Sequence, residues 1–197
     1  MRTHQSIMTE HHQNPIPDTS YDLEAIKGAL KRIVIGVDPA VTSGQNSNET
    51  GIVVAGLCYR DVGYVLEDAS LRAPATEWAA QIVAVYKKWD ADRVVAETNQ
   101  GGDLVETMLR VVAPLISYRG VKATRGKRLR AEPVAALYEQ KRILHLHQFP
   151  ELEKQMCNFQ GRASDVTDRL DALVWALTDL MVDARDLDHE RRCRGAF

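Results

Sequence analysis

Three apolar runs of strand length follow one another between residues 32 and 68, before any long helical pattern begins. They cover residues 32–38, 51–58 and 62–68, and a connection at residues 59–61 separates the last two. Short connections join antiparallel neighbours, whereas parallel neighbours need a long crossover. We therefore expect the folded region to begin with three strands that run up and down.

After residue 73 the sequence alternates between helical and strand patterns. Apolar residues at three- and four-residue spacing predict helices at residues 74–89, 103–113, 131–142, 150–158 and 166–183. Short strands are expected at 93–97 and 115–118, and residues 145–147 are a short extended piece. This order of elements is that of a ribonuclease-H-like fold. We predict an α/β protein with this fold, built on a five-stranded mixed sheet with helices on both faces.

The 197 residues are enough for one sizeable core, and the sequence shows no repeat and no second core. We expect a flexible tail at residues 1–31 with a short helix at 22–31, one domain at 32–185, and a basic tail at 186–197. No apolar run approaches the ~20 residues that span a bilayer, and the polar first thirty residues do not resemble a secretory signal. The three well-separated cysteines fit a reducing compartment. These features predict a cytoplasmic protein without a membrane partner.

Three carboxylates occupy positions where apolar packing alone would not place them. Asp38 and Glu97 each end a strand pattern, and Asp171 lies within the apolar helical stretch 169–177, one turn after Asp168. If the two strands are parallel neighbours, Asp38 and Glu97 lie at one edge of the sheet. Carboxylate oxygens suit Mg²⁺ or Mn²⁺, and two such ions ~4 Å apart can drive phosphodiester cleavage. We therefore consider Asp38, Glu97 and Asp171, with Asp168 as an auxiliary member, candidate metal ligands and catalytic residues.

Each acid taken alone also has an ordinary structural interpretation. Asp38 precedes Pro39 and suits a turn, Glu97 is placed to pair with a basic neighbour, and Asp168 is typical of a helix start. Asp171 is the least comfortable as a purely structural residue. Crowded carboxylates repel without cations, so a metal-free site is expected to be strained or partly protonated.

A basic segment separates the fifth predicted strand from the next helix. Between residues 119 and 130 it holds no acid, and its cations are Arg119, Lys122, Arg125, Lys127, Arg128 and Arg130. Gly120 and Gly126 predict a mobile loop or hairpin. A solvated surface loop is the alternative, but the lack of balancing acids favours contact with DNA phosphates. We expect Lys122, Arg125, Lys127, Arg128 and Arg130 to bind the DNA backbone, since no aromatic residues are interleaved for base stacking.

Five segments in order resemble the nuclease domain of the large terminase subunit of tailed bacteriophages and prophages. They are residues 36–40, 50–56, 96–102, 124–133 and 168–176, and the resemblance covers about residues 32–182. It implies a metal-dependent endonuclease that uses two Mg²⁺ or Mn²⁺ ions to cut concatemeric viral DNA during genome packaging. It matches Asp38, Glu97 and Asp171 to the family's metal-binding acids, and Asp168 to an auxiliary position.

One departure from the family pattern concerns the ATPase motor that usually precedes the nuclease. The sequence has no Walker A loop of the form Gly-x-x-x-x-Gly-Lys-Ser/Thr. We therefore expect an excised nuclease domain or a stand-alone relative, which would not translocate DNA by itself. The resemblance implies double-stranded DNA, the terminase small subunit, the portal and an ATPase motor as partners, in the cytoplasm of a bacterial host.

Four other functions share parts of this pattern. A Holliday-junction resolvase or an RNA–DNA hybrid nuclease would have the same fold and acids, and a resolvase would also be a stable dimer. A non-catalytic DNA-binding packaging module would keep the acids for structural reasons. An actin-like ATPase shares the early strand order, but it needs downstream nucleotide-binding glycine loops that the sequence lacks.

Overall fold

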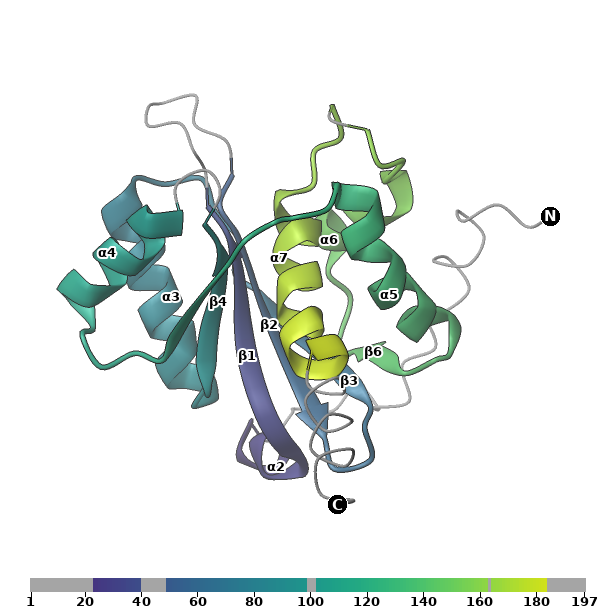
Figure 1. Cartoon of the computed structure of the whole chain (residues 1–197). Coiled ribbons are helices and arrows are strands. Elements are labelled where there is room, and N and C mark those ends of the chain that lie inside the picture. The colour runs from purple at the N-terminus through teal and green to yellow at the C-terminus, as the bar shows by residue number, and fades with distance from the viewer. Residues whose placement is uncertain (1–22, 40–48, 99–101, 163, 184–197) are drawn as a thin grey trace, which may run out of the picture.

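The computed structural model describes residues 23–39, 49–98, 102–162 and 164–183. Within these residues, six strands form one mixed sheet in the order β5-β4-β1-β2-β3-β6 (Figure 1). The strands are β1 (Leu30–Asp38), β2 (Gly51–Cys58), β3 (Gly63–Asp68), β4 (Arg93–Glu97), β5 (Tyr118–Val121) and β6 (Ile143–His145). The pairs β1–β2 and β2–β3 are antiparallel, as expected for three strands that run up and down. The pairs β1–β4, β4–β5 and β3–β6 are parallel.

Helices cover both faces of the sheet, as Figure 1 shows. One face carries α3 (Ala75–Trp89) and α4 (Gly102–Val112). The other carries α5 (Lys127–Glu139), α6 (Pro150–Asn158) and α7 (Asp168–Leu177), which continues into a π-helical turn, η1 (Thr178–Val182). A short helix, α2 (Leu23–Ala29), leads into β1. This is the predicted ribonuclease-H-like α/β architecture.

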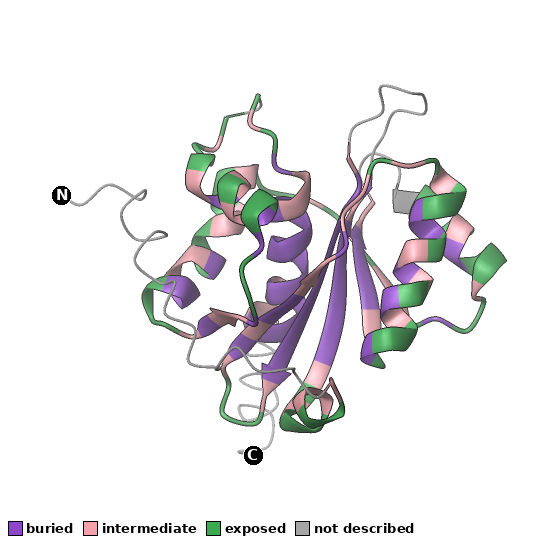
Figure 2. Cartoon of the chain, turned by 180° about the vertical axis from the view of Figure 1, so that it is seen from behind, coloured by how far each residue is buried: buried purple, intermediate pink, exposed green. Residues whose placement is uncertain are grey.

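Alternating side chains of β1 divide the core into two layers. Ile33, Ile35 and Val37 belong to the cluster under α3 and α4, and Val34 belongs to the cluster under α5, α6 and α7. Because strand side chains point alternately to opposite faces, one strand serves both layers. The central strands and α7 are accordingly the most buried parts of the molecule (Figure 2).

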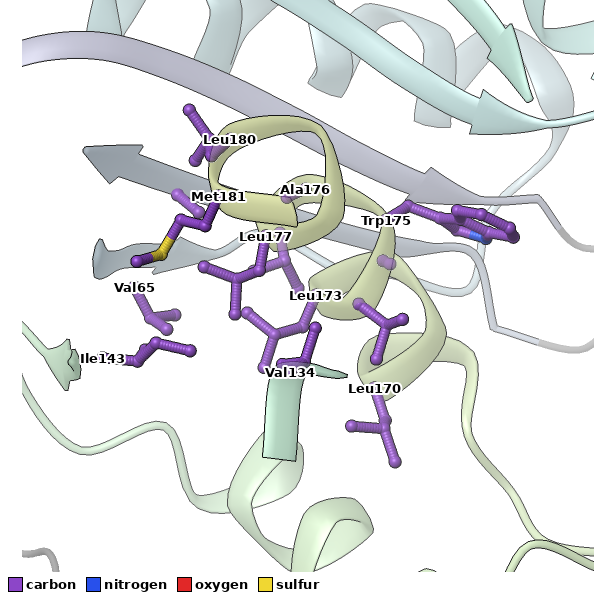
Figure 3. Packing of buried hydrophobic residues seen from close by; sticks show 14 of the residues in the cluster. Val65, Val134, Ile143, Leu170, Leu173, Trp175, Ala176, Leu177, Leu180 and Met181 are labelled. Carbon is purple, nitrogen blue, oxygen red and sulfur yellow. The ribbon is translucent and has the colours of Figure 1, made fainter. Parts of the chain in front are cut away.

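Helix α7 lies directly against the main chains of β1 and β2. A Cβ atom added to Gly36 would lie 1.9 Å from the carbonyl oxygen of Ala172, and one added to Gly51 would lie 1.9 Å from that of Asp168. Only glycine allows this approach. The apolar side of the helix, including Leu170 and Leu173, meets Val134 of α5 in the close view of the core (Figure 3).

Three sequence-based predictions need correction. The sheet has a sixth strand, β6, because the segment expected to begin at residue 145 instead pairs with β3 at residues 143–145. Strand β5 lies at 118–121 rather than 115–118, and Leu115 is 98% exposed. Helix α5 begins at Lys127 rather than at residue 131, with Pro133 in its interior. The basic residues from Lys127 to Arg130 are therefore helical, not part of a loop.

The predicted tails lie mostly outside the described residues, which exclude 1–22 and 184–197. The predicted domain boundaries therefore stay predictions, although α2 falls within the expected helix at 22–31. Among the described helices, none is both long and apolar enough to cross a membrane.

Candidate metal centre

Asp38 and Glu97 end neighbouring parallel strands. Val37 of β1 is in register with Ala96 of β4, so the acids that follow them lie at the same edge of the sheet. This confirms the arrangement on which the predicted site depended. The carboxyl edge of parallel strands is where ligand-binding groups commonly gather.

The first turn of α7 brings two more acids to this edge. Asp168 is the first residue of the helix, and its carbonyl oxygen faces Gly51, which is the register partner of Asp38 in β2. Asp171 follows one turn later and is 5% exposed. The glycine contact therefore explains how acids from a distant part of the sequence reach Asp38.

The acids perturb one another electrostatically. Burial first, and then the neighbouring charges of Asp171 and Asp168, raise the pKa of Asp38 to about 8, although Lys127 acts in the opposite direction. Burial also raises the pKa of Asp168, and Glu49 and Asp171 add to the effect against the attraction of Lys127. Desolvation and like charges both disfavour an ionised carboxylate. The site therefore holds more negative charge than its own cations offset.

Two cations from the first turn of α5 enter this cluster. Lys127 Nζ lies 2.7 Å from Asp171 Oδ2. Arg130 Nη2 lies 3.2 Å from Asp171 Oδ1, and its Nη1 lies 3.6 Å from Glu97 Oε2. The Arg130 guanidinium also lies over the Trp175 ring at 4.9 Å, and its side chain is only 12% exposed. A stacked, buried guanidinium of this kind is held more firmly than a lysine ammonium.

The predicted DNA-binding residues therefore divide into two groups. Lys127 and Arg130 point to the acids, whereas Lys122, Arg125 and Arg128 lie outside this cluster and are exposed. Positive charge in the first turn of a helix is unfavourable because the helix dipole is positive there. The carboxylate of Asp171 offsets this cost for Lys127.

Sequence reasoning missed two residues, Thr167, which touches this cluster, and Arg169, which lies beside it. The Thr167 hydroxyl donates a hydrogen bond to Asp171 Oδ2 at 2.6 Å. Arg169 turns to the other side and forms ion pairs with Glu49 at 2.6 Å and Asp68 at 2.5 Å. Thr167 precedes a helix and resembles an ordinary cap, and Arg169 resembles a surface residue between two acids. Neither position carries a local signal of its tertiary partner.

The acids fit a divalent cation by the chemistry of their donors. Carboxylate oxygens are the ligands that Mg²⁺ and Mn²⁺ prefer, and the raised pKa of Asp38 indicates that added positive charge would be stabilising. Among the described residues, no three or more Asp, Glu, His or Cys side chains are arranged to hold an ion as they stand. Lys127 and Arg130 pair with two of the acids instead.

A second buried charge cluster lies at the opposite, amino-terminal ends of these parallel strands. Asp179 of η1 is 3% exposed and accepts hydrogen bonds from Arg32 at 2.6 Å and Arg119 at 2.5 Å. Arg93 approaches the same carboxylate at 3.5 Å, and Arg119 also pairs with Asp183. These arginines come from β1, β4 and β5, so the cluster fixes the far end of the α7–η1 helix to the sheet.

The sheet order and its helices define a ribonuclease-H-like domain with a cluster of acids where β1 and β4 end. Residues 35–180 match the family model of the terminase RNase H-like domain. The chain belongs to this family. A search of curated proteins found no match.

Solved structures show the same fold. The large terminase nuclease of thermophilic phage G20c is 17% identical, with 75% of this chain and 81% of that chain covered and a TM-score of 0.56. The large terminase of another thermophilic bacteriophage is 15% identical, with 88% of this chain and 44% of that chain covered and a TM-score of 0.64. The human cytomegalovirus terminase nuclease domain is 15% identical, with 80% and 88% covered and a TM-score of 0.55. The match thus spans less than half of the second phage protein.

Proposed function

We propose that this domain is a metal-dependent DNA endonuclease that cuts concatemeric viral DNA during genome packaging. The observation that carries the proposal is the excess of carboxylates, Asp171 buried and the other three partly buried, where β1 and β4 end. Asp38, Glu97 and Asp171 would hold two Mg²⁺ or Mn²⁺ ions, and Asp168 would assist them. Membership of the terminase family supports this assignment. Solved terminase nucleases with bound zinc, bound cobalt or after a manganese soak support a requirement for divalent metal.

The residues of the site have distinct tasks in this reaction. Divalent ions supply Lewis-acid stabilisation of the phosphate and lower the pKa of a bound water. Asp38 would lose its proton as positive charge arrives, because added cations favour the ionised carboxylate against the burial and the neighbouring acids that raise its pKa. Lys127 has a flexible stem and a side chain that is 36% exposed, so it is able to exchange Asp171 for a DNA phosphate. Arg130 is more buried and would remain beside Glu97 and Asp171.

The remaining cations of the basic segment, Lys122, Arg125 and Arg128, would contact the DNA backbone near this edge. Such contacts position a duplex without reading its sequence. In the complete packaging system we expect the terminase small subunit, the portal and an ATPase motor as partners, in the cytoplasm of the bacterial host.

The direct test is cleavage of supercoiled plasmid by the purified chain in Mn²⁺ or Mg²⁺. Substitution of outer-shell partners of a metal site typically costs 10–100-fold, so loss of a ligand in Asp171→Asn should reduce cleavage by more than ~100-fold. Asp61→Asn is the matched control, because Asp61 is an exposed residue of the β2–β3 turn with a side chain that is 65% exposed. Full activity of the Asp171→Asn protein would refute the assignment.

The choice of substrate separates the neighbouring functions. A terminase nuclease should cut linear duplex DNA, whereas a resolvase should prefer four-way junctions and a hybrid nuclease should prefer RNA–DNA duplexes. Binding of duplex DNA without cleavage in any divalent cation would instead indicate a non-catalytic packaging module.

A further inference from the structure

Helix α7 begins with a threonine that does not cap it. A threonine at this position normally accepts a hydrogen bond from the second or third N–H group of the helix. Within the described part of the chain, the Thr167 side chain makes no such bond. Its hydroxyl instead donates to Asp171 Oδ2 at 2.6 Å and accepts from Lys127 Nζ at 2.5 Å. The donor and an acceptor site of this hydroxyl are therefore both committed to the acidic cluster.

A residue from another helix takes over the cap. Gln155 of α6 accepts hydrogen bonds through its Oε1 atom from the N–H groups of Arg169, at 2.9 Å, and Leu170, at 3.1 Å. These are the second and third residues of α7, whose N–H groups have no partner within the helix. The start of α7 is thus satisfied from outside while Thr167 faces the acids.

The Thr167 hydroxyl is the most enclosed of the groups that orient Asp171. Thr167 is 1% exposed, whereas the side chain of Lys127, which binds the same carboxylate oxygen, is 36% exposed. While Gln155 satisfies the N–H groups of the helix, this enclosed donor is held on Asp171. It keeps one carboxylate oxygen of Asp171 oriented whether or not Lys127 moves away.

We propose that Thr167 is a positioning residue for Asp171, and that Gln155 makes this possible by capping α7 in its place. The proposal rests on the proposed function, in which Asp171 binds a metal ion. Without the Gln155 amide, the Thr167 hydroxyl is the adjacent group able to cap the helix, and it would leave Asp171 to do so. The two residues therefore act on the metal site as a coupled pair.

The first measurement is Mn²⁺ binding to the full chain by isothermal titration calorimetry, together with the Tm of the metal-free protein. Thr167→Val should raise the Kd for Mn²⁺ by about 10–100-fold, the usual cost of losing a group that orients a metal ligand. Thr167→Ser keeps the hydroxyl and should restore binding. Thr178→Val makes the same change at the other end of the helix and should leave the Kd unchanged.

The second measurement tests the coupling. Gln155→Ala should weaken Mn²⁺ binding in the otherwise unchanged protein, because Thr167 is then drawn into the cap. In a Thr167→Val background it should have no further effect on the Kd, because no hydroxyl is left to be drawn away. Gln155→Glu keeps the accepting oxygen and should restore binding. Independent effects of the two substitutions on the Kd would overturn the proposal, since coupling is what a shared hydroxyl requires.

The outcomes separate this proposal from the proposed function. Mn²⁺ binding by the unchanged chain together with an unchanged Kd in Thr167→Val overturns the role of Thr167 alone. Absence of Mn²⁺ binding by the unchanged chain overturns the metal site itself, and the role of Thr167 with it. If Thr167→Val does not fold, Gln155→Ala and its Glu counterpart decide the question, and an unchanged Kd in Gln155→Ala overturns the proposal.

Discussion

The two ends of the α7–η1 helix carry acids to opposite ends of the strands of the same sheet. The two acid clusters differ in the ratio of carboxylates to cations. At the carboxyl edge of β1 and β4, four carboxylates meet two cations, and the pKa of Asp38 rises to about 8 because burial and neighbouring acids disfavour its charge. At the other edge, three arginines surround Asp179, and one of them also pairs with Asp183.

The ratio of carboxylates to cations distinguishes a structural charge cluster from a cluster that added positive charge would stabilise. A buried carboxylate with an excess of arginine partners is already satisfied, and removing it leaves unpaired cations. Neighbouring, largely desolvated carboxylates in excess over cations raise the free energy of the folded protein until positive charge is added. The arginine-rich edge therefore holds the helix in place, and the acid-rich edge has a reason to bind divalent metal.

The largest expected effect on stability comes from Asp179→Asn. Breaking a buried ion pair by removing one partner typically costs about 3–5 kcal/mol. The arginine side chains here are 30–40% exposed and can regain water, so we expect about 3 kcal/mol, the lower end of that range. Chemical denaturation at neutral pH measures this loss, and the Kd for Mn²⁺ should not change. A loss of equal size in metal-free Asp171→Asn would remove the contrast between the two edges.

Metal should stabilise the protein through the acid-rich edge. A ligand at 100 times its Kd stabilises the folded state by about 2.7 kcal/mol when it binds only that state. We expect an increase in Tm with Mn²⁺ in the unchanged protein and in Asp179→Asn, but not in Asp171→Asn. Equal stabilisation of all three proteins would place the metal elsewhere.

The next expected effect is on the pH dependence of the metal-free protein. The pKa of Asp38 is about 8 in the folded chain against an ordinary value of 3.8, so between these values the folded state binds more protons than the unfolded state. The contribution of Asp38 to stability is therefore present below pH 3.8 and is lost as the pH rises through about 8. In EDTA, Tm should fall as the pH rises over this range.

The matched variant for this measurement is Asp38→Asn, which cannot titrate. Its Tm should depend less on pH and should exceed that of the unchanged protein at the alkaline end. The same pH dependence in both proteins would show that Asp38 is not the group responsible.

The smallest effect concerns DNA binding and compares an exposed arginine with a paired one. Arg125→Gln should reduce the salt dependence of duplex binding by about one unit of log–log slope, as expected for a lost phosphate contact. Arg119→Gln should leave that slope unchanged and lower Tm, because Arg119 is committed to Asp179 and Asp183. Fluorescence anisotropy over a salt series measures both. The reverse result would mean that DNA lies at the arginine-rich edge.

The first three antiparallel strands could be predicted because they depend on local pattern, and the meeting of Asp38 with Glu97 follows once β1 and β4 are parallel neighbours. A strand that ends in an acid and a parallel neighbour are enough to place both at one edge. Strand β5 was misplaced because Leu115 and Ile116 look like a strand start, yet Leu115 is almost fully exposed and the actual strand is Tyr-Arg-Gly-Val. The start of α5 was missed because four basic residues and a later proline resemble a loop.

The partners of the acids could not be predicted from the sequence. Lys127 and Arg130 carry the same charge as Arg125 and Arg128, and only the helical phase of α5 decides which of them face Asp171. The Thr167 hydroxyl can bind either the N–H groups at the start of α7 or the Asp171 carboxylate. It binds Asp171, because Gln155 of another helix already accepts from those N–H groups. The catalytic and metal-binding roles of the four acids stay predictions that the experiments above address.

The contact of α7 with Gly36 and Gly51 has a consequence for how this domain can change over evolutionary time. The separation between Asp38 and the acids of α7 depends on two main chains in direct contact, not on the volume of any side chain. Exchanges among the leucines and valines of the core can therefore accumulate without moving the acids apart. A single methyl group at either glycine would push the helix away from the strands. Substitutions at these two positions should therefore not be tolerated.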